Sequence, residues 1–212
     1  MTSGTGLLLL RIVMWASCLA PAAWLGAGAY FGWLGVNPIE KLTHVTGMTA
    51  LVMLLVTLAV SPARRLTGWN PLIKIRRPLG LFAFFYAFLH FSVWMVLDLG
   101  FRLEWVWEDI LERPYITIGF SALVLLTPLA ITSTRGWIRR LGKKWTVLHR
   151  LAYLATALGL VHYYWLVKAD VRLPLLLVAA FVVLMAFRVH RWWQKRAQAR
   201  SRAPRTASAG AD

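Results

Sequence analysis

The sequence predicts an all-α membrane protein, a polytopic bundle of about six transmembrane helices with both termini in the cytoplasm. Of its 212 residues, 59% are hydrophobic and 15% are charged, whereas soluble domains are about 25% charged. The hydrophobic residues form six long runs, and the 24 Lys and Arg gather mainly between alternate runs. This distribution is typical of membrane topology, and it argues against a nucleic-acid-binding surface.

Each run is long enough to cross a membrane, since about 20 helical residues span the hydrocarbon core. The runs occupy residues 9–33, 44–60, 79–99, 115–133, 146–167 and 173–189. The first run shares Arg11 and the small residues around Ala20 with cleaved signal peptides. Because it stays apolar through residues 22–32, we expect an uncleaved first helix.

The charges of the connecting segments predict the orientation of the bundle. Five Lys or Arg and no acid lie between the second and third runs, and the same holds between the fourth and fifth. Seven of the eight Asp and Glu lie in the opposite connections. The positive-inside rule then places the basic segments and both termini in the cytoplasm.

We expect one transmembrane domain over residues 1–190 and a basic, disordered cytoplasmic tail over residues 191–212. The tail is rich in Arg, Ala and Ser, a composition that favours disorder and contact with anionic lipid headgroups. No internal repeat, second domain or glycine-rich nucleotide motif is expected.

The histidines are the candidate site residues. The single cysteine, Cys18, excludes an intramolecular disulfide and a multi-cysteine metal or iron–sulfur site. His190 belongs to the basic tail, where we expect a solvated surface residue. The other four histidines are His44, His90, His149 and His162, in or at the edges of apolar runs. An ionisable side chain inside a membrane usually marks a functional site, although a neutral imidazole can also join two helices by a hydrogen bond.

Small residues precede two of these histidines at the same offsets of 3, 7 and 10 residues. They are Ala87, Ala83 and Gly80 before His90, and Gly159, Ala155 and Ala152 before His162. On an α-helix each set lies on the same side as its histidine. We therefore predict a flat slot that holds a haem, with His90 and His162 as axial ligands of the iron. Close helix packing explains either stripe alone, but not why both end in histidine.

The remaining candidates have more than one interpretation. His149 lies 13 residues before His162 and on another face of an ideal helix. It could serve a quinone or flavin site, bind a haem with an unidentified ligand, or be structural. His44, at the outer end of its helix, could bond a haem propionate or face the interface. Arg76 and Arg77 are placed to bind carboxylates or phosphates, of propionates or of a flavin, although their topogenic role already explains them.

Four segments resemble one family of membrane proteins. They read NPIEKLTHVTGMTAL, RRPLGLFAFFYAFLHF, ERPYITIG and TSTRGWIRRLGKKWTVLHRLAYLATALGLVHYYWLVK. In order and spacing they are similar to the MsrQ family, formerly YedZ, within the wider ferric-reductase-like transmembrane group. The likeness covers most of residues 35–190.

The resemblance implies electron transfer across the bacterial inner membrane. Members of the family take electrons from the quinol pool or from a cytoplasmic flavin reductase. They pass them through haem b, with FMN also bound, to a periplasmic molybdopterin subunit. That partner reduces methionine sulfoxide in oxidised proteins and so repairs them, which places the catalytic centre on the partner.

The resemblance also carries residue roles to this sequence. His90, His149 and His162 match the haem-associated histidines of the family, and His44 matches a further histidine. Related two-haem oxidases have a second histidine where this chain has a basic residue, so a second haem lacks its expected ligand. Two other functions stay open. The chain could be a stand-alone quinol-linked ferric or metal reductase, or a transporter or structural protein whose histidines only pack.

Overall fold

The computed structural model describes residues 4–167 and 169–202, with side chains as far as residue 198. Within these residues the chain is helical and has no strand. Its α-helices are α1 (Gly4–Phe31), α2 (Pro38–Thr67), α3 (Ile73–Val93), α4 (Leu103–Glu112), α5 (Pro114–Ile131), α6 (Arg135–Leu141), α7 (Lys143–Leu148), α8 (Leu151–Leu166) and α9 (Arg172–Arg202). A 3₁₀ turn, η1 (Asn70–Leu72), leads into α3, and a π-helical turn, η2 (Trp94–Asp98), follows it. This confirms the predicted all-α fold.

Five helical segments are long and apolar enough to cross a membrane, namely α1, α2, α3 with its flanking turns, α5 and α9. The structure differs from the prediction over residues 146–167, where a single transmembrane helix was expected. Helix α7 ends at Leu148, and α8 begins at Leu151 and has only 16 residues. The protein is a multi-pass membrane protein, but the chain breaks between α7 and α8, a break that the apolar run did not reveal.

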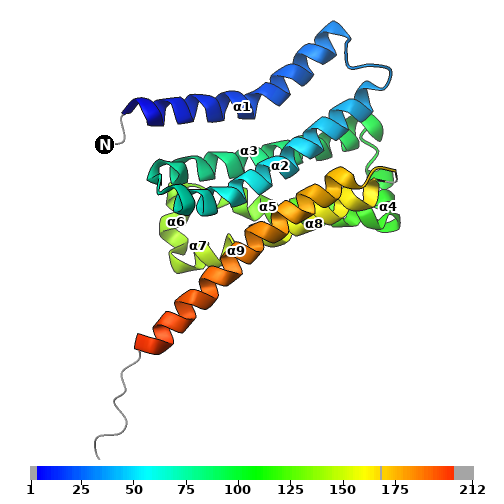
Figure 1. Ribbon diagram of the computed structural model, residues 1–212. Helices are drawn as coiled ribbons and strands as arrows, with labels where there is room; N and C mark the ends of the chain where they lie inside the picture. The colour runs from blue at the N-terminus through cyan, green and yellow to red at the C-terminus, as the bar shows by residue number, and fades with distance from the viewer. Residues whose placement is uncertain (1–3, 168, 203–212) are drawn as a thin grey trace, which may run out of the picture.

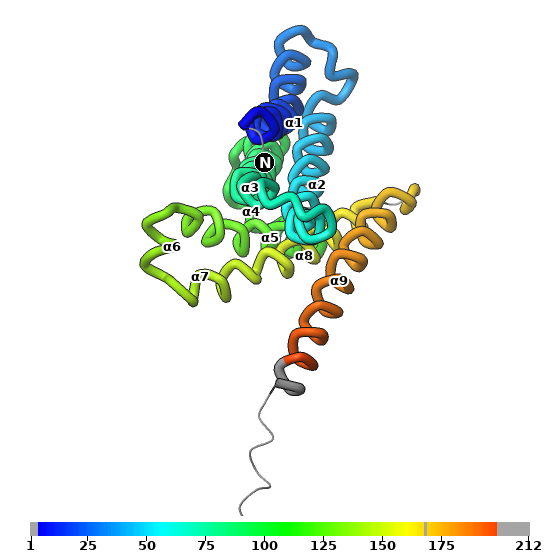
Figure 2. Tube along the Cα trace, turned by 60° about the vertical axis from the view of Figure 1, so that its left-hand side comes forward, coloured from blue at the N-terminus to red at the C-terminus, as the bar shows by residue number. Residues whose placement is uncertain are grey.

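Two antiparallel helix pairs form the centre of the bundle, α2 with α3 and α5 with α8. Helix α1 packs outside the first pair, and α9 runs along α2 and α8 (Figures 1 and 2). One end of the bundle carries the α1–α2 connection, α4 and the α8–α9 connection (Figure 1). The opposite end carries the α2–α3 turn, α6 and α7. This arrangement gives each helix pair one inner wall facing the other pair.

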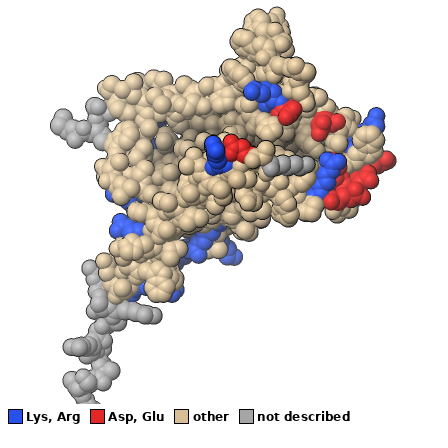
Figure 3. Space-filling model, turned by 45° about the vertical axis from the view of Figure 1, so that its right-hand side comes forward, with Lys and Arg blue, Asp and Glu red and all other residues tan. Residues whose placement is uncertain are grey.

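The two ends of the bundle differ in charge. The Asp and Glu side chains visible in Figure 3 gather at the end that carries α4. Helix α6, at the other end, contains Arg135, Arg139 and Arg140 and no acid. The positive-inside rule therefore continues to predict that the end with α6 and α7 is cytoplasmic.

The C-terminal region differs from the predicted disordered tail. Helix α9 continues to Arg202, so residues 191–202 are helical. Arg, Gln, Ala and Lys are good helix formers, and a helix that has already begun extends at little cost. The expected domain boundary at residue 190 thus falls inside α9. The rest of the predicted tail, residues 203–212, lies outside the described residues.

Helix α1 is attached to the bundle through a fully buried tyrosine on α3. The Tyr86 hydroxyl donates to the carbonyl of Cys18 at 2.7 Å and accepts from the amide of Ala22 at 3.0 Å. In an uninterrupted helix these two backbone groups would bond to each other. Pro21 lies between them, and a proline inside a helix disturbs the local hydrogen-bond ladder. The tyrosine satisfies backbone groups that hydrocarbon could not.

We expect Tyr86→Phe to lower the free energy of unfolding by about 1–2 kcal/mol, because both hydrogen bonds to α1 are lost in a buried place. Chemical or thermal unfolding of the purified protein in detergent measures this loss. Tyr30→Phe is the control, since Tyr30 lies on α1 and is 85% exposed. Equal stability of the two variants would contradict the role given to Tyr86.

Candidate functional site

A cavity of about 300 Å³ lies between the two helix pairs, at the lower end of the volume range of ligand pockets. His90 of α3 and His162 of α8 border it from opposite walls. The centres of their rings are 6.1 Å apart, and the ring planes make an angle of 75°. The structure therefore brings together the two histidines that were predicted to act as a pair.

Each imidazole is held by a backbone carbonyl. His90 Nδ1 lies 2.9 Å from the carbonyl oxygen of Thr43, and His162 Nδ1 lies 2.6 Å from that of Tyr115. A carbonyl oxygen only accepts, so Nδ1 is the protonated nitrogen of each ring. In a neutral imidazole this leaves Nε2 with a free lone pair, and within the described residues neither Nε2 has a hydrogen-bond partner. Histidines that bind metal through Nε2 are commonly oriented in this way.

A glycine on the neighbouring helix makes room for each ring. A Cβ on Gly47 would lie 2.9 Å from Cε1 and Nδ1 of His90. A Cβ on Gly119 would lie 2.8 Å from His162 Nδ1. Both distances are shorter than van der Waals contact, so only glycine permits these ring positions.

These contacts belong to an internal repeat, so the expectation that the chain has no repeat was wrong. An offset of 72 residues relates the groups of the two helix pairs. It takes the carbonyl of Thr43 to that of Tyr115, Gly47 to Gly119, and His90 to His162. The same offset aligns GMTALVML of α2 with GFSALVLL of α5, a similarity that could have been found from sequence alone. The cavity thus lies between two equivalent helix pairs, and each pair supplies one histidine, one carbonyl and one glycine.

The two stripes of small residues have two functions. Ala87 and Gly159, one turn before each histidine, line the cavity as predicted. Ala83 and Ala155, one turn further away, are 0% exposed and lie in the hydrophobic core. Close helix packing, the alternative interpretation, therefore explains the distant part of each stripe, and the slot is confined to the part beside the histidines.

The cavity opens toward the end of the bundle that carries α4. His44 borders it and is exposed, consistent with its predicted place at the outer mouth. Arg113 and Asp98 also border the cavity but were not predicted as site residues. Arg113 forms an ion pair with Asp109 at 3.1 Å, and Asp98 comes from the π-helical turn after α3, an element that apolar periodicity does not reveal.

The structure does not bring the other three candidates to this cavity. His149 follows α7, where its Nε2 lies 3.2 Å from the Thr132 hydroxyl and its ring stacks on Trp145. The break before α8 also means that the ideal-helix angle between His149 and His162 does not apply. Arg76 lines a separate cleft at the opposite end, and Arg77 is exposed.

We expect Gly47→Ala and Gly119→Ala each to destabilise the protein by about 1–3 kcal/mol, because the added methyl group forces an imidazole from its place. Gly26→Ala is the control, since a Cβ on Gly26 meets nothing within 4 Å. Unfolding in detergent compares the three variants. A loss as large in Gly26→Ala would show that the effect does not come from the histidine rings.

Comparison with known proteins supplies the family. Residues 41–160 match the family model described as ferric reductase like transmembrane component. A Caulobacter vibrioides protein is 47% identical over 193 residues, which is 91% of this chain and 90% of that protein. A Xanthomonas oryzae pv. oryzae protein is 44% identical over 212 residues, which is 97% of this chain and 95% of that protein.

A Rhodospirillum rubrum protein is 48% identical over 180 residues, which is 84% of this chain and 86% of that protein. All three relatives are named protein-methionine-sulfoxide reductase heme-binding subunit MsrQ. These matches extend over nearly the whole length of the relatives and agree with the resemblance found in the motifs. The chain therefore belongs to the ferric-reductase-like transmembrane family and, within it, to the MsrQ proteins.

Proposed function

We propose that this chain is a haem b electron-transfer subunit of the bacterial inner membrane that serves a periplasmic methionine sulfoxide reductase. The observation that carries the proposal is the pair of imidazoles across one cavity, each with Nδ1 bonded to a carbonyl. The relatives' names support both the haem and the reductase partner.

The residues at the cavity fit a haem. A metal–nitrogen bond to histidine is about 2 Å long, so two imidazoles that share one iron hold their ring centres roughly 6 Å apart. The observed separation of 6.1 Å agrees with this value. A bound haem would supply one-electron oxidation and reduction at its iron.

The chain's own residues would hold the group and tune it. His90 and His162 would hold the iron through Nε2, and the bonds from Nδ1 to Thr43 and Tyr115 would keep the two rings in place. Ala87 and Gly159 leave space for the macrocycle. His44 and Arg113 border the open end, where they would pair with the propionates. His149 does not border this cavity, so it is not assigned to this haem.

The position of the cavity supports delivery of electrons to the periplasm. Asp98, Arg113 and Tyr115 border the cavity, at the end of the bundle that the positive-inside rule makes external. The donor would be the quinol pool or a cytoplasmic flavin reductase, with FMN as a further cofactor, and the acceptor a molybdopterin subunit that repairs oxidised periplasmic proteins. The two alternative donors, the FMN and the molybdopterin acceptor are all inferred from the family resemblance.

His90→Ala and His162→Ala should each abolish or strongly reduce the Soret band and the reduced α-band of the purified protein, because one of two iron ligands is lost. His190→Ala is the control, since His190 is exposed, lies outside the cavity lining and bonds to Gln194 at 2.8 Å. Absorption spectra with pyridine-haemochrome quantitation provide the measurement. Unchanged spectra in both ligand variants would refute the proposal.

The family model's description, ferric reductase like, favours a second candidate, a stand-alone ferric or metal reductase. Spheroplasts with and without the partner subunit distinguish the two. We expect external methionine sulfoxide reduction to require both subunits, and external ferric reduction to be negligible without the partner. Quinol-dependent ferric reduction that persists in the absence of the partner would instead support the stand-alone reductase.

A further inference from the structure

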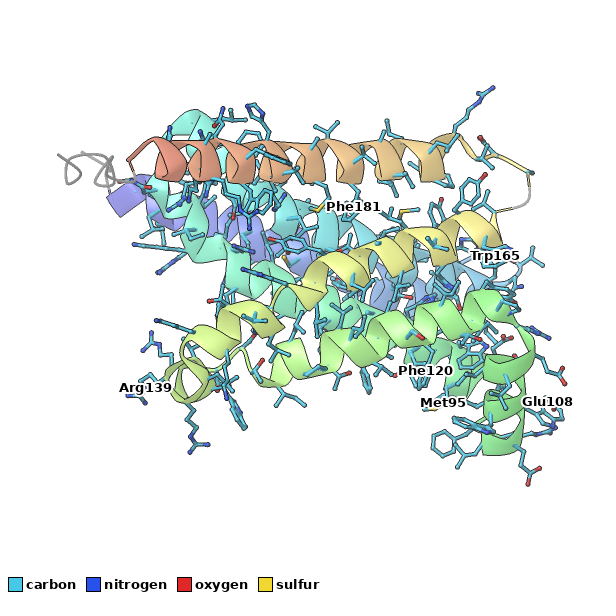
Figure 4. The ribbon with its side chains drawn as sticks, turned by 90° about the horizontal axis from the view of Figure 1, so that it is seen from below. Met95, Glu108, Phe120, Arg139, Trp165 and Phe181 are labelled. Carbon is cyan, nitrogen blue, oxygen red and sulfur yellow. The ribbon has the colours of Figure 1, made fainter. Side chains whose placement is uncertain are left out.

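A second hollow, of about 840 Å³, lies at the end of the bundle opposite the open end of the histidine cavity. Its walls are formed by the ends of α2 and α7, the beginnings of α3 and α8, and the C-terminal part of α9. It shares no lining residue with the histidine cavity. Figure 4 shows α9 running alongside α8, with Arg139 of α6 at this end of the bundle and Glu108 of α4 at the other. We call this hollow the basic cleft.

The basic cleft concentrates positive charge without an internal counter-ion. Its charged lining residues are Arg65, Arg76, Arg150, Arg188, Arg191 and Lys195, and no acid lines it. In the part of the chain that the structure describes, the ion pairs are Arg113–Asp109 and Arg172–Asp170, both at the opposite end. Like charges held together repel one another, so an anion from outside the chain would stabilise the cleft.

Two of the cations are fixed by contacts within the protein. Pro62 of α2 has no amide hydrogen, so it cannot bond the carbonyl of Leu58, and the Arg188 guanidinium donates to this carbonyl instead. Arg188 also lies over the Tyr153 ring, 5.3 Å from its centre. Arg76 donates to the Ser61 hydroxyl at 3.1 Å. A site whose cations are already positioned loses little entropy when it binds a ligand.

The surroundings of the basic cleft match an amphiphilic ligand. Val189 and Trp192 line it and are 54% and 47% exposed. On the same helix, Val182 and Val183 are exposed and face away from the packed core. A tryptophan between an apolar face and a cluster of arginines is typical of the membrane–water interface. A ligand here would place its anionic group among the arginines and its apolar part along α9.

We propose that the basic cleft binds the phosphate headgroup of an anionic phospholipid of the cytoplasmic leaflet, with the acyl chains along the exposed face of α9. Basic pockets between transmembrane helices on the cytoplasmic side suit such headgroups. A soluble phosphate ester shares the phosphate chemistry but would leave the apolar face of α9 uncovered. The site goes beyond the proposed electron transfer and does not depend on it.

The test uses the full-length protein in detergent, titrated with cardiolipin or with phosphatidylcholine and followed by native mass spectrometry. The cleft variant is Arg150→Gln/Arg191→Gln/Lys195→Gln, which changes three exposed residues and leaves Arg76 and Arg188 in place. Its control is Arg135→Gln/Arg139→Gln/Arg140→Gln, which removes the same charge from exposed residues of α6 outside the cleft. Thermal unfolding of both variants in detergent reports whether folding is intact, independently of the histidine cavity.

We expect wild-type protein to bind cardiolipin in preference to phosphatidylcholine, the cleft variant to bind cardiolipin at least about tenfold more weakly, and the control to stay within about threefold of wild type. Equal losses in both variants would indicate diffuse attraction and overturn the proposal, as would no loss in the cleft variant or no preference for cardiolipin. Displacement of cardiolipin by inorganic phosphate or FMN at matched phosphate concentration would assign the cleft to a soluble phosphate and overturn the lipid assignment.

Discussion

The two hydrogen bonds from histidine Nδ1 to a backbone carbonyl are the constraint on which the site depends. They fix the tautomer of His90 and His162, and therefore decide that Nε2 is the nitrogen with a free lone pair. The accepting carbonyls belong to α2 and α5. Each imidazole is therefore oriented by the partner helix within its own pair, His90 by α2 and His162 by α5. A shift within either helix pair would move an imidazole, so the packing of the bundle controls the geometry of the cavity.

The same need to satisfy backbone groups inside a membrane shapes the rest of the bundle. Prolines interrupt α1 and α2, and at each interruption a side chain from another helix supplies a partner. Tyr86 bonds to α1, and Arg188 bonds to the carbonyl of Leu58 in α2. In hydrocarbon no water can replace these partners. Polar residues on α3 and α9 therefore position the outer helices that apolar contact alone would leave free to slide.

The repeat explains why one cavity carries paired groups. Equivalent helix pairs that face each other present equivalent groups from two sides, so a histidine, a backbone carbonyl and a glycine each occur twice at the cavity. The ends of the bundle do not share this equivalence. Arg77 and His149 occupy matching positions 72 residues apart, so toward the end with α6 and α7 the two repeats carry a cation and a histidine at equivalent positions, whereas at the cavity both repeats carry a histidine.

The sequence by itself determined the membrane class, the charge asymmetry of the two ends, and the pairing of His90 with His162, because run length, loop charge and residue spacing are properties of a linear chain. It did not determine the break at His149 or the helical extension of α9, since no apolar periodicity marks either of them. Only the tertiary structure decided which part of each small-residue stripe faces a cavity, which carbonyl holds each imidazole, and which cations share a cleft. These depend on contacts between residues distant in the sequence, which no local pattern encodes.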